Sequence, residues 1–290
     1  MRDPFDGAWA KLDRAHDRLR ELDVFVQDFI DLKPYGFHAE LDRQGSSEVA
    51  IAGDVYHRFH HRVVLRGRVF HPVPVVELGS LIGELVHDLR SALDHLVWEL
   101  VLAEEAEAPP FPIPRDSSWL GVGFPICFSP ESWESSWKRR IWGIHPQAEL
   151  FRALQPYVTG PNDPVREPLA VLHNLWNIDK HRAAPVVGSV LSISGVGTIP
   201  PAIDLPLIKT RLVQPHFGPF EEDDVLAEVD MTTSGLIGRA FAQDYLDHYL
   251  GRSFGVAFGD GPPAYGAEVR DVGGRMYEAV RSILDGFEPA

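Results

Sequence analysis

The spacing of apolar residues changes period along this chain, and the order of those changes constrains the fold more than any other feature. Helical spacing over residues 7–32 gives way to the two-residue alternation of strands over about 37–72. Helical spacing returns over about 77–182, strand-like alternation occupies 184–258, and an amphipathic helix is predicted over 267–286. Because the helices and strands are grouped, they do not form alternating βαβ units. The order predicts an α+β fold, in which a bundle of about four main helices packs against an antiparallel β-sheet.

We expect the 290 residues to form a single α+β domain. Apolar residues make up 44% of the chain and charged residues 24%, close to a globular average, and no internal repeat divides it. The single cysteine, Cys127, excludes an internal disulfide and fits a reducing compartment. The first residues are charged and lack the apolar segment of a secretory signal. The uncharged run over 183–203 is interrupted by prolines and glycines, which favours strands and turns. We therefore predict a cytoplasmic protein without a membrane partner.

The charge of the chain limits its partners. A net charge of −15 produces a field that repels nucleic acid. A role with RNA or DNA would therefore need a local basic surface. The candidates are the run Lys138-Arg139-Arg140 and the pair Lys209 and Arg211.

The predicted helix over 77–104 carries the segment HDLRSALDH at residues 87–95. Its apolar residues cover one side of a helical wheel, and His87, Arg90 and Asp94 fall within about 60° of each other on the far side. Arg90 and Asp94 are four residues apart and can form an ion pair. His95 lies about 140° from Arg90 on a straight helix.

A second polar stripe lies on the predicted helix over 163–182, with Asp163 as its N-cap. His173, Asn177 and His181 recur every four residues on one face, and Lys180 flanks them. On both helices two histidines are eight residues apart, which is about 12 Å of helix rise. Two histidines of one helix therefore cannot share a metal ion, and a site would need groups from both helices.

The same two segments resemble a group of uncharacterised bacterial proteins with helices of the form GxxxHxLRSALDHLVW and LHxLxxIDKHR. The matching positions lie within 83–98 and 172–182, and the FPI of 124–126 and the LQPY of 154–157 also resemble that group. The resemblance covers roughly 75–185 and implies family membership without a known activity.

A more distant resemblance is to HEPN-type helical proteins, many of which are RNases. Their motif is an arginine followed, after four to six residues, by a histidine, as in Arg90 to His95. In that chemistry the arginine stabilises the phosphorane charge and the histidine moves the proton of the 2′-hydroxyl. The resemblance thus implies catalytic roles for Arg90 and His95, with Asn177 and His181 assisting.

Three hypotheses remain open, and they do not agree on whether the chain is an enzyme. The first is a HEPN-like RNase or nucleic-acid-related module. The second is a divalent-metal site between the two helices. The third is a non-catalytic interaction or sensor protein whose polar helices form a structural His/Asn/Asp network. RNA is the candidate partner and a homodimer the candidate assembly, while the sequence specifies no cofactor. The candidate catalytic residues are Arg90, His95, Asn177 and His181, and the candidate ligand-binding residues are His87, Asp94, His173 and Lys180.

Overall fold

The computed structural model describes residues 5–51, 54–107, 121–141, 143–180, 186–194, 209–216, 218–233, 238–259 and 263–287. The predicted α+β class is confirmed, because the chain combines helices with antiparallel sheets. Internal contacts divide the chain into two compact units. Unit 1 comprises residues 1–25, 74–186 and 258–290, and unit 2 comprises residues 26–73 and 187–257. That both units belong to one domain stays a prediction.

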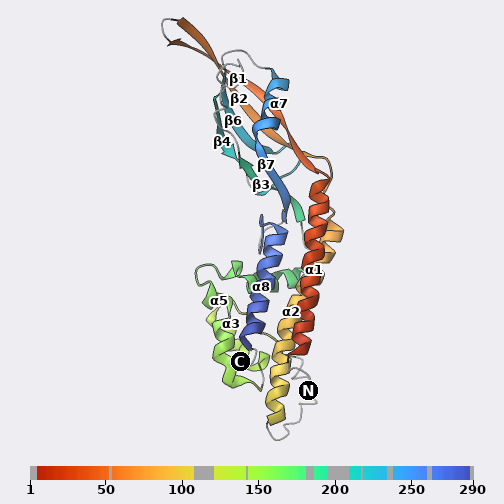
Figure 1. The fold of residues 1–290 in the computed structure, drawn as a ribbon. Coiled ribbons are helices and arrows are strands. Elements are labelled where there is room, and N and C mark those ends of the chain that lie inside the picture. Colours follow the sequence, from red (N-terminus) through yellow and green to blue (C-terminus); the bar gives the residue numbers. More distant parts are fainter. Residues whose placement is uncertain are drawn as a thin grey trace. The chain divides into compact units, whose positions relative to one another are not determined.

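Unit 1 is helical (Figure 1). Helix α2 contacts α6 and α8, and α6 also contacts α8. The middle of the apolar side of α2 is buried, as its periodicity predicts, and Leu85, Leu89 and Leu93 are each at most 1% exposed. The elements are α1 (Asp6–Asp31, ending in unit 2), α2 (Val75–Glu107), α3 (Pro130–Arg140), η2 (His145–Gln147), α4 (Ala148–Ala153), α5 (Pro156–Thr159), η3 (Pro164–Arg166), α6 (Pro168–Asp179) and α8 (Val269–Phe287).

The start of α6 differs from the prediction. Asp163 and Pro164 begin only the short turn η3, and α6 begins at Pro168 with Glu167 as its N-cap residue. The cause is local, because the ring of a proline disfavours helical backbone at the preceding residue. Glu167 is accordingly extended, with φ −61° and ψ 141°, and the helix starts anew after it.

Polar contacts between α1 and α2 account for several charged residues of the HDLRSALDH region. The Asp88 side chain is 2% exposed and lies 3.8 Å from Lys11 Nζ and 3.4 Å from Arg14 Nε on α1. One turn beyond His95, Glu99 Oε1 accepts the backbone N–H of Gly7 at 3.0 Å. Glu99 therefore binds a backbone donor at the start of α1 that has no partner within its own helix.

Unit 2 contains two β-sheets, whereas the sequence predicted one (Figure 1). The four-stranded sheet has the order β1-β2-β6-β4 and the three-stranded sheet the order β5-β3-β7. Strand β1 pairs antiparallel with β2 from Tyr35 opposite Val69 to Ile51 opposite Asp54. The strands are β1 (Tyr35–Ile51), β2 (Asp54–Val69), β3 (Val186–Ser194), β4 (Lys209–Pro215), β5 (Gly218–Pro219), β6 (Val225–Thr233) and β7 (Gly251–Phe258).

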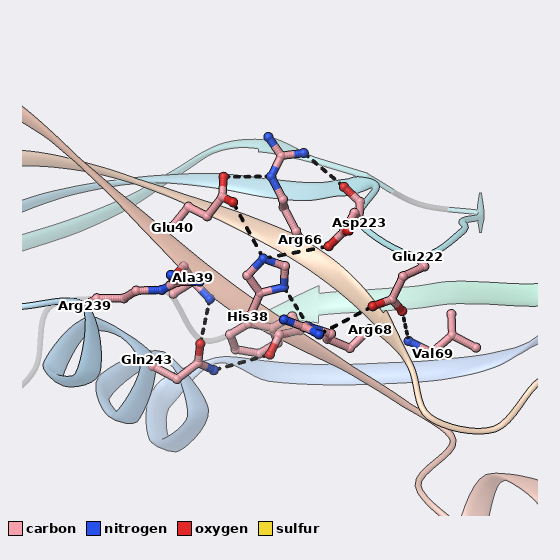
Figure 2. A network of polar contacts seen from close by, with 11 residues as sticks. His38, Ala39, Glu40, Arg66, Arg68, Val69, Glu222, Asp223, Arg239 and Gln243 are labelled. Carbon is pink, nitrogen blue, oxygen red and sulfur yellow. Dashed lines mark hydrogen bonds and ion pairs between the residues drawn. The ribbon is translucent and has the colours of Figure 1, made fainter.

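Helix α7 (Arg239–Tyr249) covers the free edge of β1 (Figure 2). Gln243 Oε1 accepts the N–H of Ala39 at 2.6 Å, and its Nε2 donates to the carbonyl of Phe37 at 3.4 Å. Arg239 Nε donates to the carbonyl of Ala39 at 2.8 Å. Two side chains thus replace a neighbouring strand, which protects an edge that could otherwise pair with another chain.

On the outer face of β1 and β2, charged side chains are paired with each other (Figure 2). Arg66 Nε donates to Glu40 Oε2 at 2.7 Å, and Arg68 Nε donates to His38 Nδ1 at 3.0 Å. His38 Nε2 lies 3.7 Å from Glu40 Oε1 and 3.9 Å from Asp223 Oδ1. Because these carboxylates are about half exposed or more, each pair contributes little stability.

None of the described helices combines the length and the apolar character that a membrane span requires.

Candidate functional site

The centre of the candidate site is an ion pair within α2, whose arginine is buried and whose aspartate is partly exposed. Arg90 is 4% exposed, and its Nε and Nη2 donate to Asp94 Oδ2 and Oδ1 at 3.1 and 2.7 Å. This confirms that the two side chains pair, as their four-residue spacing predicts. Arg90 Nη2 also donates to the carbonyl of Phe124 at 2.7 Å, and Asp94 Oδ1 accepts the Phe124 N–H at 2.8 Å. The pair therefore holds both backbone groups of Phe124, which is fully buried.

Glycines allow the loop and α6 to approach α2 closely. A Cβ on Gly123 would lie 2.7 Å from Asp94 Oδ1, an oxygen already fixed by Arg90 and Phe124. A Cβ on Gly83 would overlap the carboxylate of Asp179 on α6. Both positions therefore have to lack a side chain for the loop and α6 to lie against α2.

The other side of Arg90 meets α6. The guanidinium carbon of Arg90 lies 5.2 Å from the ring centroid of Trp176, and Lys180 Nζ lies 3.0 Å from the same centroid. Cation–π attraction of this kind stabilises a cation next to the indole. One indole thus lies beside two cations, from α2 and from the end of α6.

A third cation, Arg140, comes from the last turn of α3. The Gly123 N–H donates to the Arg140 carbonyl at 2.9 Å, which ties the end of α3 to the loop held by Arg90. Burial, followed by the charges of Arg90 and Arg139, lowers the pKa of Arg140. Partial desolvation, followed by the charges of Arg90 and Arg140, likewise lowers the pKa of Lys180. Among the described residues Arg140 has no ion-pair partner, so this cluster holds more positive than negative charge.

His173 completes the cluster from α6. Its ring lies 5.7 Å from that of Phe128 and 6.4 Å from that of Trp176. Burial, together with the charges of Arg90, Arg140 and Lys180, lowers the pKa of His173 to about 4. The imidazole is therefore neutral at pH 7. Its Nδ1 is buried and has no hydrogen-bond partner among the residues that the structure describes. We call Arg90, Asp94, Arg140, His173, Trp176 and Lys180 the α2–α6 cluster.

The structure separates His95 from this cluster and shows no contact of the other candidates with it among the described residues. His95 is exposed, and its Nδ1 would lie 3.0 Å from a Cβ on Gly7 at the start of α1. Arg90 and His95 therefore contact different parts of unit 1 and do not meet. His87 is exposed and Asn177 is half-buried, and neither has a described hydrogen bond or ion pair. His181 lies outside the described residues.

The residues available for a metal ion are few. Within the described ranges, no three His, Cys, Asp or Glu side chains gather as metal ligands would. Asp94 directs both carboxylate oxygens at Arg90. The geometry of the α2–α6 cluster accordingly suits an anion better than a cation.

Two residues of the cluster were not among the predicted site residues. The sequence placed Arg140 only in a basic run and gave no site role to Trp176. The only signal for Arg140 is its position beside the apolar Ile141, which is fully buried. No local pattern links the end of α3 to α2, because Arg140 and Arg90 are 50 residues apart.

Comparison with known proteins adds no assignment, since no protein-family model, no curated protein and no solved structure matches this chain.

Proposed function

We propose that unit 1 is a nucleic-acid-binding module that holds a backbone phosphate at the α2–α6 cluster. Its proposed scaffold is a bundle of α1, α2, α6 and α8. The observation that carries the proposal is the half-buried Arg140, which lies close to two further cations and has no carboxylate partner among the described residues. Asp94 supplies one negative charge beside Arg90, Arg140 and Lys180, which supply three positive charges. A bound anion would relieve this repulsion.

The mixture of donors favours a phosphate. Arginine and lysine are the side chains that most often bind phosphate oxygens. His173 is neutral at pH 7 because its pKa is about 4, so it can donate an N–H to an oxyanion without adding to the repulsion. Because the net charge of −15 repels a polyanion, binding one requires a local basic site of this kind.

Binding is favoured over cleavage. A general acid or base works best with a pKa near the operating pH, and the pKa of His173 is too low for that. The Arg90–His95 pair of the HEPN-like hypothesis would need its two members in one site, and they contact different parts of unit 1. The RNase hypothesis is therefore the weaker form of the proposal.

A structural network is the second candidate function of the two polar helices. Asp88, Arg90, Asp94 and Glu99 each contact another part of unit 1, which is what a non-catalytic interaction or sensor protein requires. The two candidates are compatible, since Arg90 and Asp94 can position the loop while Arg140, Lys180 and His173 contact the ligand.

The proposal is tested by fluorescence anisotropy with an end-labelled single-stranded RNA of mixed sequence. Arg140→Gln and Lys180→Gln are each expected to weaken binding about threefold to tenfold, and to reduce the slope of log K against log salt concentration by about 0.7. Lys138→Gln is the matched control, because Lys138 lies on α3 with Arg140 but is exposed, and it should change binding much less.

Wild-type protein that fails to bind RNA at low salt would contradict the proposal, as would equal binding by Arg140→Gln, Lys180→Gln and wild type. The RNA is also analysed on a gel after incubation. Cleavage that His95→Ala abolishes would support the RNase hypothesis and overturn the proposal of binding without cleavage.

A further inference from the structure

A second feature with the properties of a binding site lies in unit 2, at the end of α1. A hollow of about 540 Å³ opens there, within the size range of small-molecule sites. Its walls come from the end of α1, the start of β1, the end of α7 and the start of β7. They are lined by Ile30, Lys33, Pro34, Tyr35, Asp247, Leu250, Arg252, Ser253 and Phe254.

The lining combines apolar and polar residues, and most of its charge is already paired. Arg252 Nη2 lies 3.1 Å from Asp247 Oδ1, and its guanidinium carbon lies 4.6 Å from the ring centroid of Phe37. The second oxygen of Asp247 accepts Gln243 Nε2 at 2.9 Å. Lys33 lines the same hollow and forms no ion pair with any described residue. The hollow thus combines an apolar wall with one unmatched positive charge.

The backbone at Lys33 is unusual. Its φ is 53°, in the left-handed region, and it follows the last turn of α1 and precedes Pro34. Glycine is the usual residue at such a helix end, because it has no Cβ to strain there. The sequence has a lysine instead. A side chain in a strained backbone position is a reason to look for a function.

We propose that this hollow binds a small amphipathic anion, whose apolar body contacts Ile30, Leu250 and Phe254 and whose carboxylate or sulfonate group pairs with Lys33. A neutral apolar molecule would gain only the apolar contacts, and a small hydrophilic anion would gain only the ion pair. The site does not depend on the α2–α6 cluster, since all of its lining residues belong to unit 2.

The test compares two probes that share an apolar body, 1-naphthalenesulfonate and the neutral 1-naphthalenemethanol, by isothermal titration calorimetry on the full chain. The sulfonate is expected to bind one site per chain, about fivefold tighter than the alcohol. Lys33→Glu should remove this difference and leave the affinity for the alcohol unchanged. Lys138→Glu, an exposed lysine of unit 1, is the control and should leave both affinities unchanged.

Lys33→Gly separates a binding role from a structural one. Glycine tolerates a φ of 53°, so this variant should unfold at the same temperature as wild type or higher, while it loses the preference for the sulfonate. Equal affinities of the two probes for wild type would overturn the proposal. So would a preference for the sulfonate that persists in both Lys33 variants.

Discussion

Replacing Arg90 by methionine tests whether the buried ion pair of α2 holds unit 1 together. Methionine keeps most of the apolar volume of the arginine stem and fits irregular surroundings, so the change removes the guanidinium with little effect on packing. It removes two hydrogen bonds to Asp94 and one to the carbonyl of Phe124. The Asp94 carboxylate then keeps only the Phe124 N–H, and the Phe124 carbonyl loses Arg90 Nη2.

The magnitude follows from the exposure of the groups left behind. Removing one member of a buried ion pair costs about 3–5 kcal/mol. The side chain of Asp94 is 36% exposed, so water can replace part of what the carboxylate loses, and the lower end of that range applies. The buried Phe124 carbonyl has no such access, and an unmet buried acceptor costs about 1–3 kcal/mol. The cost of the carbonyl adds to that of the carboxylate, so we expect Arg90→Met to lower the free energy of unfolding by about 3 kcal/mol or more.

The assay is urea unfolding followed by tryptophan fluorescence. All seven tryptophans belong to unit 1, so the signal reports this unit and not the sheets of unit 2. Arg166→Met is the matched control, because Arg166 also pairs with an aspartate, Asp163 at 3.1 Å, but its side chain is 84% exposed. Loss of an exposed pair should cost less than about 1 kcal/mol.

A loss below about 1 kcal/mol for Arg90→Met, or a loss equal to that of Arg166→Met, would refute this account of the pair. A double-mutant cycle with Asp94→Asn measures the interaction directly. The two changes should be clearly non-additive, with a coupling energy of about 1–3 kcal/mol, because both act on the same hydrogen bonds. Additive effects would mean that Arg90 stabilises unit 1 through other contacts.

Three further predictions concern stability and aggregation. The pKa of His173 is lowered to about 4 in the folded chain, so the unfolded chain takes up the proton first as the pH falls. The free energy of unfolding of unit 1 should therefore decrease between about pH 6.5 and pH 4. His173→Phe should reduce the slope of this decrease, by no more than about 1.4 kcal/mol per pH unit. Gly123→Ala should lower the unfolding free energy by about 1–3 kcal/mol in the same urea experiment, since its Cβ would meet the fixed Asp94 oxygen. Gly274→Ala on α8, where no described atom lies within 4 Å, is the control and should be neutral or stabilising. Gln243→Ala should expose the edge of β1 and increase aggregation measured by light scattering on warming, and unchanged aggregation would show that α7 protects the edge without this side chain.

Local sequence patterns predicted the long helices well. Helices α1, α2 and α8 each bury an apolar stripe that recurs every three to four residues, and such a stripe needs no knowledge of the partner element. The Arg90–Asp94 pair was predictable for the same reason, because residues four apart on a helix are neighbours wherever the helix packs. The early start predicted for α6 shows the limit of this reasoning, because Pro168 interrupted an otherwise helical pattern.

Spacing alone was a poor guide to the site. An arginine followed by a histidine after four intervening residues occurs four times in this chain, from Arg66, Arg90, Arg140 and Arg211. The spacing therefore cannot show which pair shares a site. In the structure, Arg90 is beside Trp176 and His95 is beside the start of α1, because five residues of helix turn the two side chains to different faces.

The sequence by itself determined the α+β class, the order of the long helices and strands, and the ion pair within α2, because each depends on residues close together in the chain. Tertiary structure alone decided that the strands form two sheets and that α7 covers the edge of β1. It also decided that Arg140, His173 and Lys180 gather beside the Arg90–Asp94 pair. Those contacts join segments tens to hundreds of residues apart, and they depend on which surfaces exclude water together, which no local period records.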